Sequence, residues 1–280
     1  MNAVEFRNIS KRFGSFHLDD ISFDLEEGSV LGIIGENGAG KTTILKMILG
    51  FLKADEGSLK VLGCDNLRKH PEVRERIGFV MNEAGFPDAL NAKNINYILK
   101  EAHKNWNEQF FNDILKRLDC EIDRNMRSLS QGNRMKLMIA ASLAHEPDLL
   151  IMDEACNFLD PVARSEIINI LYEYTRNEKK TLILSSHITS DLEKIADYIL
   201  FLHKGKILQF APKDEILDQY RYVNADSEII EALDPEDVAA LRKTDFACEA
   251  IIRSGACTSD MQIANASLEQ IFTAVTKGVI

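Results

Sequence analysis

The stretch that decides the fold of this chain is Gly35-Glu36-Asn37-Gly38-Ala39-Gly40-Lys41-Thr42. The apolar run Val30–Ile34 precedes it and the largely apolar segment Ile44–Leu49 follows it, so the sequence predicts a strand, a glycine-rich loop and a helix. Small residues at this spacing let successive backbone N–H groups surround a phosphate chain, while the positive end of the helix faces the same anion. We therefore expect a nucleotide-binding loop.

Two side chains at the end of this loop supply the chemistry that a phosphate site needs. Lys41 would bridge the β- and γ-phosphates of the nucleotide, and the Thr42 hydroxyl would hold Mg²⁺. The remaining loop residues expected to bind the nucleotide are Gly35, Asn37, Gly38, Ala39 and Gly40.

The composition indicates a folded, acidic protein. With 280 residues, 45% of them hydrophobic, the chain can bury a sizeable core. Its formal net charge is −11 and it has no Lys/Arg-rich tract, so we expect no nucleic-acid partner. Five scattered cysteines without zinc-ligand spacing predict reduced thiols. The chain lacks a signal peptide and a run of 18 apolar residues, so any membrane contact would be made through a partner.

Three further apolar runs each end in polar side chains. The runs and the polar residues that follow them are Leu149–Met152 with Asp153 and Glu154, Thr181–Leu184 with His187, and Ile77–Met81 with Asn82. Because the carboxyl ends of parallel strands meet at one edge of a sheet, we expect these side chains to lie near the phosphate loop.

Ahead of the loop, Val4–Ile9 and Leu18–Leu25 alternate in hydrophobicity and predict an antiparallel β edge. Phe13 lies on the expected turn between these strands. An aromatic ring there could stack on adenine, or it could be a half-buried packing residue, and the sequence leaves both interpretations open.

The rest of the chain divides into a helical insertion and a short tail. From about residue 84 to 145, apolar residues recur at helical spacing. Beyond Tyr220 the sequence predicts helices and one strand, at Glu228–Leu233, Pro235–Arg242 and Ser267–Val275 for the helices and Ala247–Arg253 for the strand. We therefore predict a main domain over 1–217 with a helical subdomain over 84–145, and a small C-terminal accessory domain over 218–280. The tail is too short for a large core of its own.

A further motif, Ser128-Leu129-Ser130-Gln131-Gly132-Asn133, precedes one of the predicted helices. Together with the glycine loop, Asp153-Glu154, the segment Asn157–Asp160 and His187, in this order and spacing, it resembles the ABC-type ATPases over about residues 1–217. The resemblance implies an α/β P-loop NTPase fold with a mostly parallel sheet, an antiparallel β edge, an inserted helical subdomain and, here, a small C-terminal α+β appendage. It also implies ATP and Mg²⁺ as cofactors.

The resemblance assigns roles to the polar residues. Asp153 and Asn82 would bind Mg²⁺ with Thr42, Glu154 would be the general base, and His187 would contact the γ-phosphate, so the expected catalytic residues are Lys41, Glu154 and His187. Thr43 would contact the α-phosphate. Ser130 and Gly132 would bind the nucleotide held by a second ATP-binding subunit, either a copy of this chain or a paralogue.

The sequence departs from the family pattern without removing a charge that the chemistry needs. Asn82 and Asn133 stand where glutamine is usual, and Ala155-Cys156 replace Pro-Thr. Cys156 is interpreted as a small buried filler, with a redox-sensitive thiol as the alternative. We therefore expect an active ATPase.

By the same resemblance, the chain would be the ATP-hydrolysing subunit of a transporter, at the cytoplasmic face of the cell membrane, working with separately encoded transmembrane permease subunits. The ending Ala266–Phe272 is similar to bacterial exporters of antibiotics and peptides, so export of a drug-like or amphipathic peptide is expected. The alternatives are a soluble ABC ATPase that acts on nucleic acid or ribosomes, and an importer ATPase.

The segment Asn82–Leu90 is a candidate hinge beside the expected permease contact. By resemblance, a short helix of the permease would dock there, with Phe86 as an apolar anchor. The alternative is that Phe86 and Leu90 pack the helical insertion against the nucleotide core.

Overall fold

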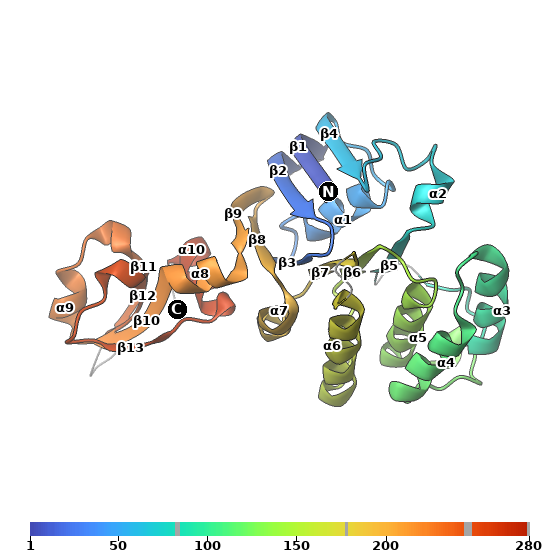
Figure 1. Cartoon of the computed structure of the whole chain (residues 1–280). Helices are drawn as coiled ribbons and strands as arrows, with labels where there is room; N and C mark the ends of the chain where they lie inside the picture. The colour runs from blue at the N-terminus through green and yellow to red at the C-terminus, as the bar shows by residue number, and fades with distance from the viewer. Residues whose placement is uncertain (82–84, 177–178, 244–247, 279–280) are drawn as a thin grey trace.

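The computed structural model describes residues 1–81, 85–176, 179–243 and 248–278. The strands of these residues form three sheets, and Figure 1 shows the largest sheet in the middle of the molecule, with layers on both of its faces. The fold is α/β, as the sequence predicts.

The central sheet has six strands in the order β5-β6-β7-β3-β8-β9. They span Ile77–Met81 (β5), Leu149–Asp153 (β6), Thr181–Ser185 (β7), Val30–Gly35 (β3), Tyr198–His203 (β8) and Lys206–Pro212 (β9). Only β9 pairs in the antiparallel direction. Every residue of β3, β6 and β7 is buried, because both faces of these strands are covered, and this explains why their sequences are almost continuously apolar.

An antiparallel sheet and one helix cover the first face. The sheet has the order β2-β1-β4, with Asn2–Phe13 (β1), Phe16–Glu26 (β2) and Glu56–Val61 (β4). Helix α1 (Lys41–Ile48) lies between it and the central sheet (Figure 1). The short helix α2 (Pro71–Arg74) then leads into β5. The strand pair predicted ahead of the glycine loop is confirmed, although β1 continues through Phe13 and the turn follows at Gly14.

Helices cover the second face. They span Ala92–Ala102 (α3), Glu108–Arg117 (α4), Gln131–Leu143 (α5), Pro161–Thr175 (α6) and Thr189–Ile195 (α7). The first three helices supply the periodic apolar residues that the sequence shows, and these residues join one large core with the central strands.

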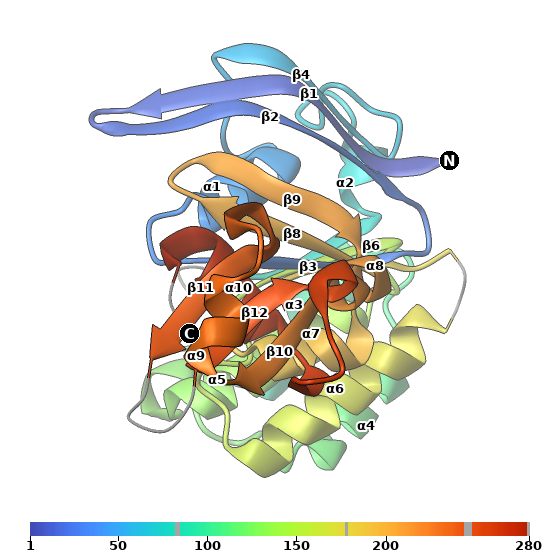
Figure 2. The ribbon, with the colours of Figure 1, turned by 90° about the vertical axis from the view of Figure 1, so that its left-hand side faces the viewer.

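The C-terminal segment contains the third sheet, in the order β11-β12-β10-β13. Figure 2 shows β11, β12 and β10 of this sheet. Its elements are Lys213–Gln219 (α8), Tyr220–Ala225 (β10), Ser227–Glu231 (α9), Val238–Lys243 (β11), Cys248–Arg253 (β12), Gln262–Asn265 (β13) and Leu268–Lys277 (α10). Three of these strands, β10, β11 and β13, were not predicted from the sequence.

The prediction of a helix over Pro235–Arg242 is wrong. Pro235–Asp237 forms a single 3₁₀ turn that the Asp234 side chain caps, and Val238–Lys243 is the strand β11. Pairing with β12 buries Ala240 against the core, and this tertiary contact outweighs the local helix preference.

Helix α10 packs the tail onto the main body of the chain. The ring of Phe272 lies 5.3 Å from the ring of Phe201 on β8. The backbone N–H of Leu268 donates to Glu193 Oε1 on α7 at 2.7 Å. Within the described ranges, no helix is both long and apolar enough to cross a membrane.

Candidate nucleotide site

The glycine loop joins β3 to α1 and takes a backbone shape that glycine permits. Gly38 and Gly40 have φ angles of +79° and +113°, in the left-handed region. A Cβ on Gly35 would lie 2.6 Å from the backbone oxygen of Leu202, so the loop can leave β3 only through a residue without a side chain. Helix α1 then begins at Lys41, with its N-terminus facing the loop.

The loop borders an open cavity of about 390 Å³. The described residues that line the cavity are Phe16, Glu36, Asn37, Gly38, Gly40, Lys41, Thr42, Thr43, Met81, Asp153 and Glu154. Most of the predicted residues of the glycine loop therefore share one space with Asp153 and Glu154, which come from a distant part of the chain. Ala39 is buried against Gly35 behind the loop.

The aromatic residue in this lining is Phe16, which sequence reasoning missed. Phe16 opens β2, and its ring lies close to Gly40. Phe13 is 43% exposed, with Lys11 Nζ 5.5 Å from its ring centre, and it does not line the cavity. Adenine stacking by Phe13 stays a prediction. The sequence signal that could have found Phe16 is its position as an aromatic residue directly after the turn, three residues beyond Phe13.

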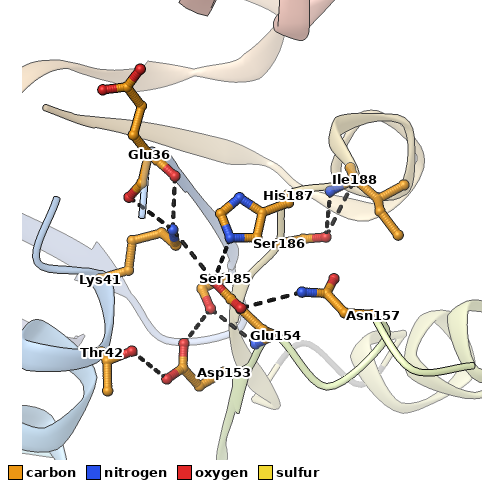
Figure 3. A network of polar contacts seen from close by, with 11 residues as sticks. Glu36, Lys41, Thr42, Asp153, Glu154, Asn157, Ser185, Ser186, His187 and Ile188 are labelled. Carbon is orange, nitrogen blue, oxygen red and sulfur yellow. Dashed lines mark hydrogen bonds and ion pairs between the residues drawn. The ribbon is translucent and has the colours of Figure 1, made fainter. Parts of the chain in front are cut away.

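Thr42 and Asp153 meet at the edge of the cavity (Figure 3). Thr42 Oγ1 donates to Asp153 Oδ2 at 2.6 Å, and Ser185 Oγ donates to Asp153 Oδ1 at 2.6 Å. A hydroxyl and a carboxylate are the hard oxygen ligands that Mg²⁺ prefers, and the cation normally completes its shell with phosphate and water. Among the described residues, no group of three or more His, Cys, Asp or Glu side chains could hold a metal ion. The predicted ligand Asn82 lies outside the described residues.

Lys41 is nearly buried and points across the loop (Figure 3). Its ammonium group donates to the backbone oxygen of Gly35 at 2.7 Å and to that of Glu36 at 3.3 Å. The same group lies 3.4 Å from Glu154 Oε1. Lys41 is thus held by acceptors that a phosphate chain would partly replace.

Glu154 is fixed by both its backbone and its carboxylate. Its φ angle is +53°, an uncommon value for a residue with a side chain, and its N–H contacts both the backbone oxygen and Oγ of Ser185 at 3.1 Å. His187 Nε2 lies 2.7 Å from Glu154 Oε1, and Asn157 Nδ2 donates to Oε2 at 3.3 Å. These contacts aim the carboxylate toward the phosphate loop (Figure 3).

The His187 loop is itself a short hydrogen-bonded turn. The backbone N–H of Ile188 donates to Ser186 Oγ at 2.9 Å, across His187. The polar residues of this site that sequence reasoning did not single out are Glu36, Asn157 and Ser185. Ser185 is the buried last residue of β7, at the same edge of the sheet as Asp153, so its position on that strand was the available signal.

Ser130 and Gly132 lie at the start of α5, and neither is among the described residues that line the cavity. Ser130 caps the helix by accepting from the Asn133 N–H at 3.2 Å. A Cβ on Gly132 would come within 3.0 Å of the backbone oxygen of Phe158, so the helix start packs closely on that loop. The chain therefore presents a second helix N-terminus apart from its own phosphate loop.

Comparison with known proteins identifies the relatives of this arrangement. The family model described as ABC transporter matches residues 18–157, which include the glycine loop and Glu154. The bacitracin transport ATP-binding protein BcrA of Bacillus licheniformis is 30% identical over 224 residues, covering 78% of this chain and 72% of BcrA. The probable sulfate/thiosulfate import ATP-binding protein CysA of Chlorella vulgaris is 32% identical over 222 residues, covering 77% of this chain and 94% of CysA.

The solved structures agree with the fold. The dimeric structure of the ATP-binding cassette MJ0796, in a post-hydrolysis state bound to ADP and Pi, superposes with a TM-score of 0.67. It is 21% identical and covers 75% of this chain and 98% of the cassette. The described architecture is that of an ATP-binding cassette.

Proposed function

The chain belongs to the ABC transporter family, as an ATP-binding and ATP-hydrolysing subunit, and we propose that it drives export of an antibiotic or amphipathic peptide through a separate permease. The similarity to BcrA supports export, and the convergence of Lys41, Glu154 and His187 at the phosphate loop supports the proposed site of ATP hydrolysis. The direction and substrate of transport belong to the proposal, as do the roles of individual residues.

In the proposed mechanism, Glu154 accepts the proton of the water that attacks the γ-phosphate. His187 holds the carboxylate at 2.7 Å and keeps it aimed at that water. Lys41 moves from Glu154 toward the phosphates when ATP binds, which frees the base at the same time as it neutralises developing charge on the phosphate. A Mg²⁺ ion, held by Thr42 and Asp153, would supply further neutralisation of the phosphate charge.

We propose that the active form is a dimer in which Ser130 and Gly132 of one subunit complete the nucleotide site of the other. This is supported by the position of the α5 N-terminus, where backbone N–H groups suit an anion although the chain's own cavity does not include them. The chain carries both half-sites, so two identical copies are sufficient.

The permease contact is proposed at an apolar groove beside β5, the edge strand of the central sheet. The groove has a volume of about 270 Å³, and its lining residues include Phe79, Phe86, Leu99 and Met138. Phe51 and Phe79 stack edge to face at 5.5 Å, and both are exposed. Phe86 lines the groove and also packs on the large core, so each of its two sequence-based interpretations has a contact that supports it. A short apolar helix of the transmembrane subunit is the proposed occupant, and it would hold the chain at the cytoplasmic face of the membrane.

Export is favoured by the similarity to BcrA, whereas the similarity to CysA supports import as the second candidate. Inside-out vesicles that contain this chain and its transmembrane partner separate the two. We expect ATP-dependent accumulation of labelled bacitracin in these vesicles, and none with Glu154→Gln. Sulfate uptake by intact cells that depends on the chain would instead support import.

A further inference from the structure

An ion pair between a partly exposed arginine and a buried aspartate joins the helices that follow the Asn157 and His187 loops. Arg164 is in the first turn of α6, and Asp191 is in the first turn of α7. Arg164 Nε lies 3.6 Å from Asp191 Oδ2. Asp191 is only 3% exposed, so water barely reaches its carboxylate.

The charge on Asp191 depends on Arg164. Burial raises the pKa of Asp191, and the positive charge of Arg164, followed by that of Lys194, acts in the opposite direction. Oδ2 accepts no hydrogen bond from the described residues, so the ion pair is its polar contact. Apolar residues usually fill such a position at lower cost than a buried charge, so stability alone gives little reason to keep the pair.

The two partners stand at the starts of helices whose preceding loops belong to the site. Helix α6 follows the loop Asn157–Asp160, which supplies the hydrogen bond from Asn157 to Glu154. Helix α7 follows the turn that carries His187. The ion pair therefore connects the first turns of the two helices that follow these loops. The loops themselves hold the Glu154 carboxylate from opposite sides.

Cys156 completes this polar layer. Its side chain is buried, and burial, with a contribution from Asp191, raises the pKa of the thiol to about 12. The thiol therefore stays protonated and fills space beside the ion pair, in agreement with the interpretation of Cys156 as a buried filler.

We propose that Arg164 and Asp191 are positioning residues for ATP hydrolysis. Their ion pair fixes α7 against α6, so that His187 and Asn157 hold Glu154 in the orientation that the attacking water requires. Neither residue touches the nucleotide. The inference rests on the proposed roles of Glu154 and His187, and it adds the ion pair that fixes their positions relative to each other.

The test compares steady-state ATP hydrolysis by the full chain and its variants, well below their melting temperatures. Asp191→Asn keeps the side-chain volume and removes the charge. We expect kcat to fall about tenfold while KM for ATP changes less than twofold, because the phosphate loop begins a different helix. Asp191→Glu, which restores the carboxylate, should recover most of the lost kcat.

Arg164→Gln provides the second arm, because Arg164 is partly exposed and its replacement deprives the buried Asp191 carboxylate of its cation. It should lower kcat about tenfold. The double variant Arg164→Gln with Asp191→Asn should have a kcat no lower than that of either single variant, because each substitution already removes the same ion pair. The matched control is Arg117→Gln, which removes an ion pair with Glu166 and Glu173 on the outer side of α6 and should leave kcat unchanged.

The outcomes separate this inference from the proposed function. Normal kcat in a folded Arg164→Gln variant would overturn the positioning role, as would a double variant whose loss equals the product of the two single losses. If Asp191→Asn does not fold, the Arg164→Gln result decides alone. Absence of ATP hydrolysis by the unmodified chain would instead overturn the proposed roles of Glu154 and His187.

Discussion

Glu154 is the residue on which the proposed chemistry depends. Its left-handed backbone is held by Ser185, and its carboxylate contacts Lys41, His187 and Asn157. A non-glycine residue in this conformation costs about 1–3 kcal/mol, and such strain persists where the surrounding contacts impose it. We interpret the strain as a means of pointing the carboxylate into the phosphate site.

Replacing Glu154 with glutamine should therefore separate binding from turnover. The amide keeps the shape of the side chain and removes the base, so kcat should fall by at least about a hundredfold while ATP still binds. Steady-state hydrolysis and equilibrium binding of a fluorescent ATP analogue measure the two effects. Near-normal hydrolysis would remove Glu154 from the proposed role.

His145 should make the folded chain sensitive to acid. It stacks on His103 with ring centres 4.4 Å apart, and burial, followed by the neighbouring His103, lowers its pKa to about 4. An unfolded chain has a histidine pKa of about 6.5, so it takes up a proton first as the pH falls. The free energy of unfolding should then decrease by about 1.4 kcal/mol per pH unit between pH 6.5 and about 4, and His145 should contribute no slope above that window.

His145→Phe keeps an aromatic ring in the stack and removes the titrating group. Urea unfolding of both proteins between pH 7.5 and 4.5 isolates the contribution of His145, because the other titrating groups are common to both. The variant should lose less stability than the unmodified chain as the pH falls. Parallel curves would show that His145 does not contribute to the acid sensitivity.

Sequence reasoning works best for residues whose spacing along the chain carries the chemistry. Lys41, Thr42 and Asp153 do meet, because the glycine loop and the ends of buried strands determine where they lie. Phe16 and Ser185 were missed because their importance comes from neighbours that are distant in sequence. The sequence around Ser130 indicates a capped helix. The contact proposed for Ser130 is to the nucleotide of another subunit, so the fold of one chain does not contain it.

At the scale of elements, burial on both faces made the central strands predictable. The strands β6 and β7 are almost continuously apolar and lie inside the parallel sheet. The segment Pro235–Arg242 has no such pattern, and pairing with β12 turns most of it into a strand. The strand β13 is exposed at every position and lies at the edge of its sheet. Its sequence therefore lacks the alternation of buried apolar and exposed polar residues that would predict a strand.

The groove next to β5 gives a prediction at this scale. Phe79 is 38% exposed and contacts Phe51, so Phe79→Ala should leave the melting temperature and ATP hydrolysis of the isolated subunit nearly unchanged. If the groove receives the permease helix, the same variant should weaken co-purification with the transmembrane subunit. Phe86→Ala should weaken it as well, with some loss of stability because Phe86 also packs on the core.

The two variants control each other in this experiment. Thermal melts and detergent co-purification with the transmembrane partner provide both readouts. Unchanged partner binding by Phe79→Ala, together with loss of several degrees of melting temperature by Phe86→Ala, would show that Phe86 serves the core and that the permease binds elsewhere.

At the scale of the whole molecule, the phosphate loop and the proposed half-site at Ser130 do not meet within the described residues. The phosphate loop borders one cavity, and Ser130 caps a helix that this cavity does not include. The C-terminal sheet packs through α10 onto β8 and α7, next to the segment that carries His187. The account therefore predicts that hydrolysis requires two chains.

The most direct test of this central claim is the size of the Glu154→Gln protein in solution with Mg²⁺ and ATP. Light scattering after gel filtration should show a dimer with ATP and a monomer with ADP, because the variant binds ATP without consuming it. Adding Ser130→Arg should return the ATP-bound protein to a monomer, since the larger side chain would collide with the partner's nucleotide. A monomer under all of these conditions would contradict the account.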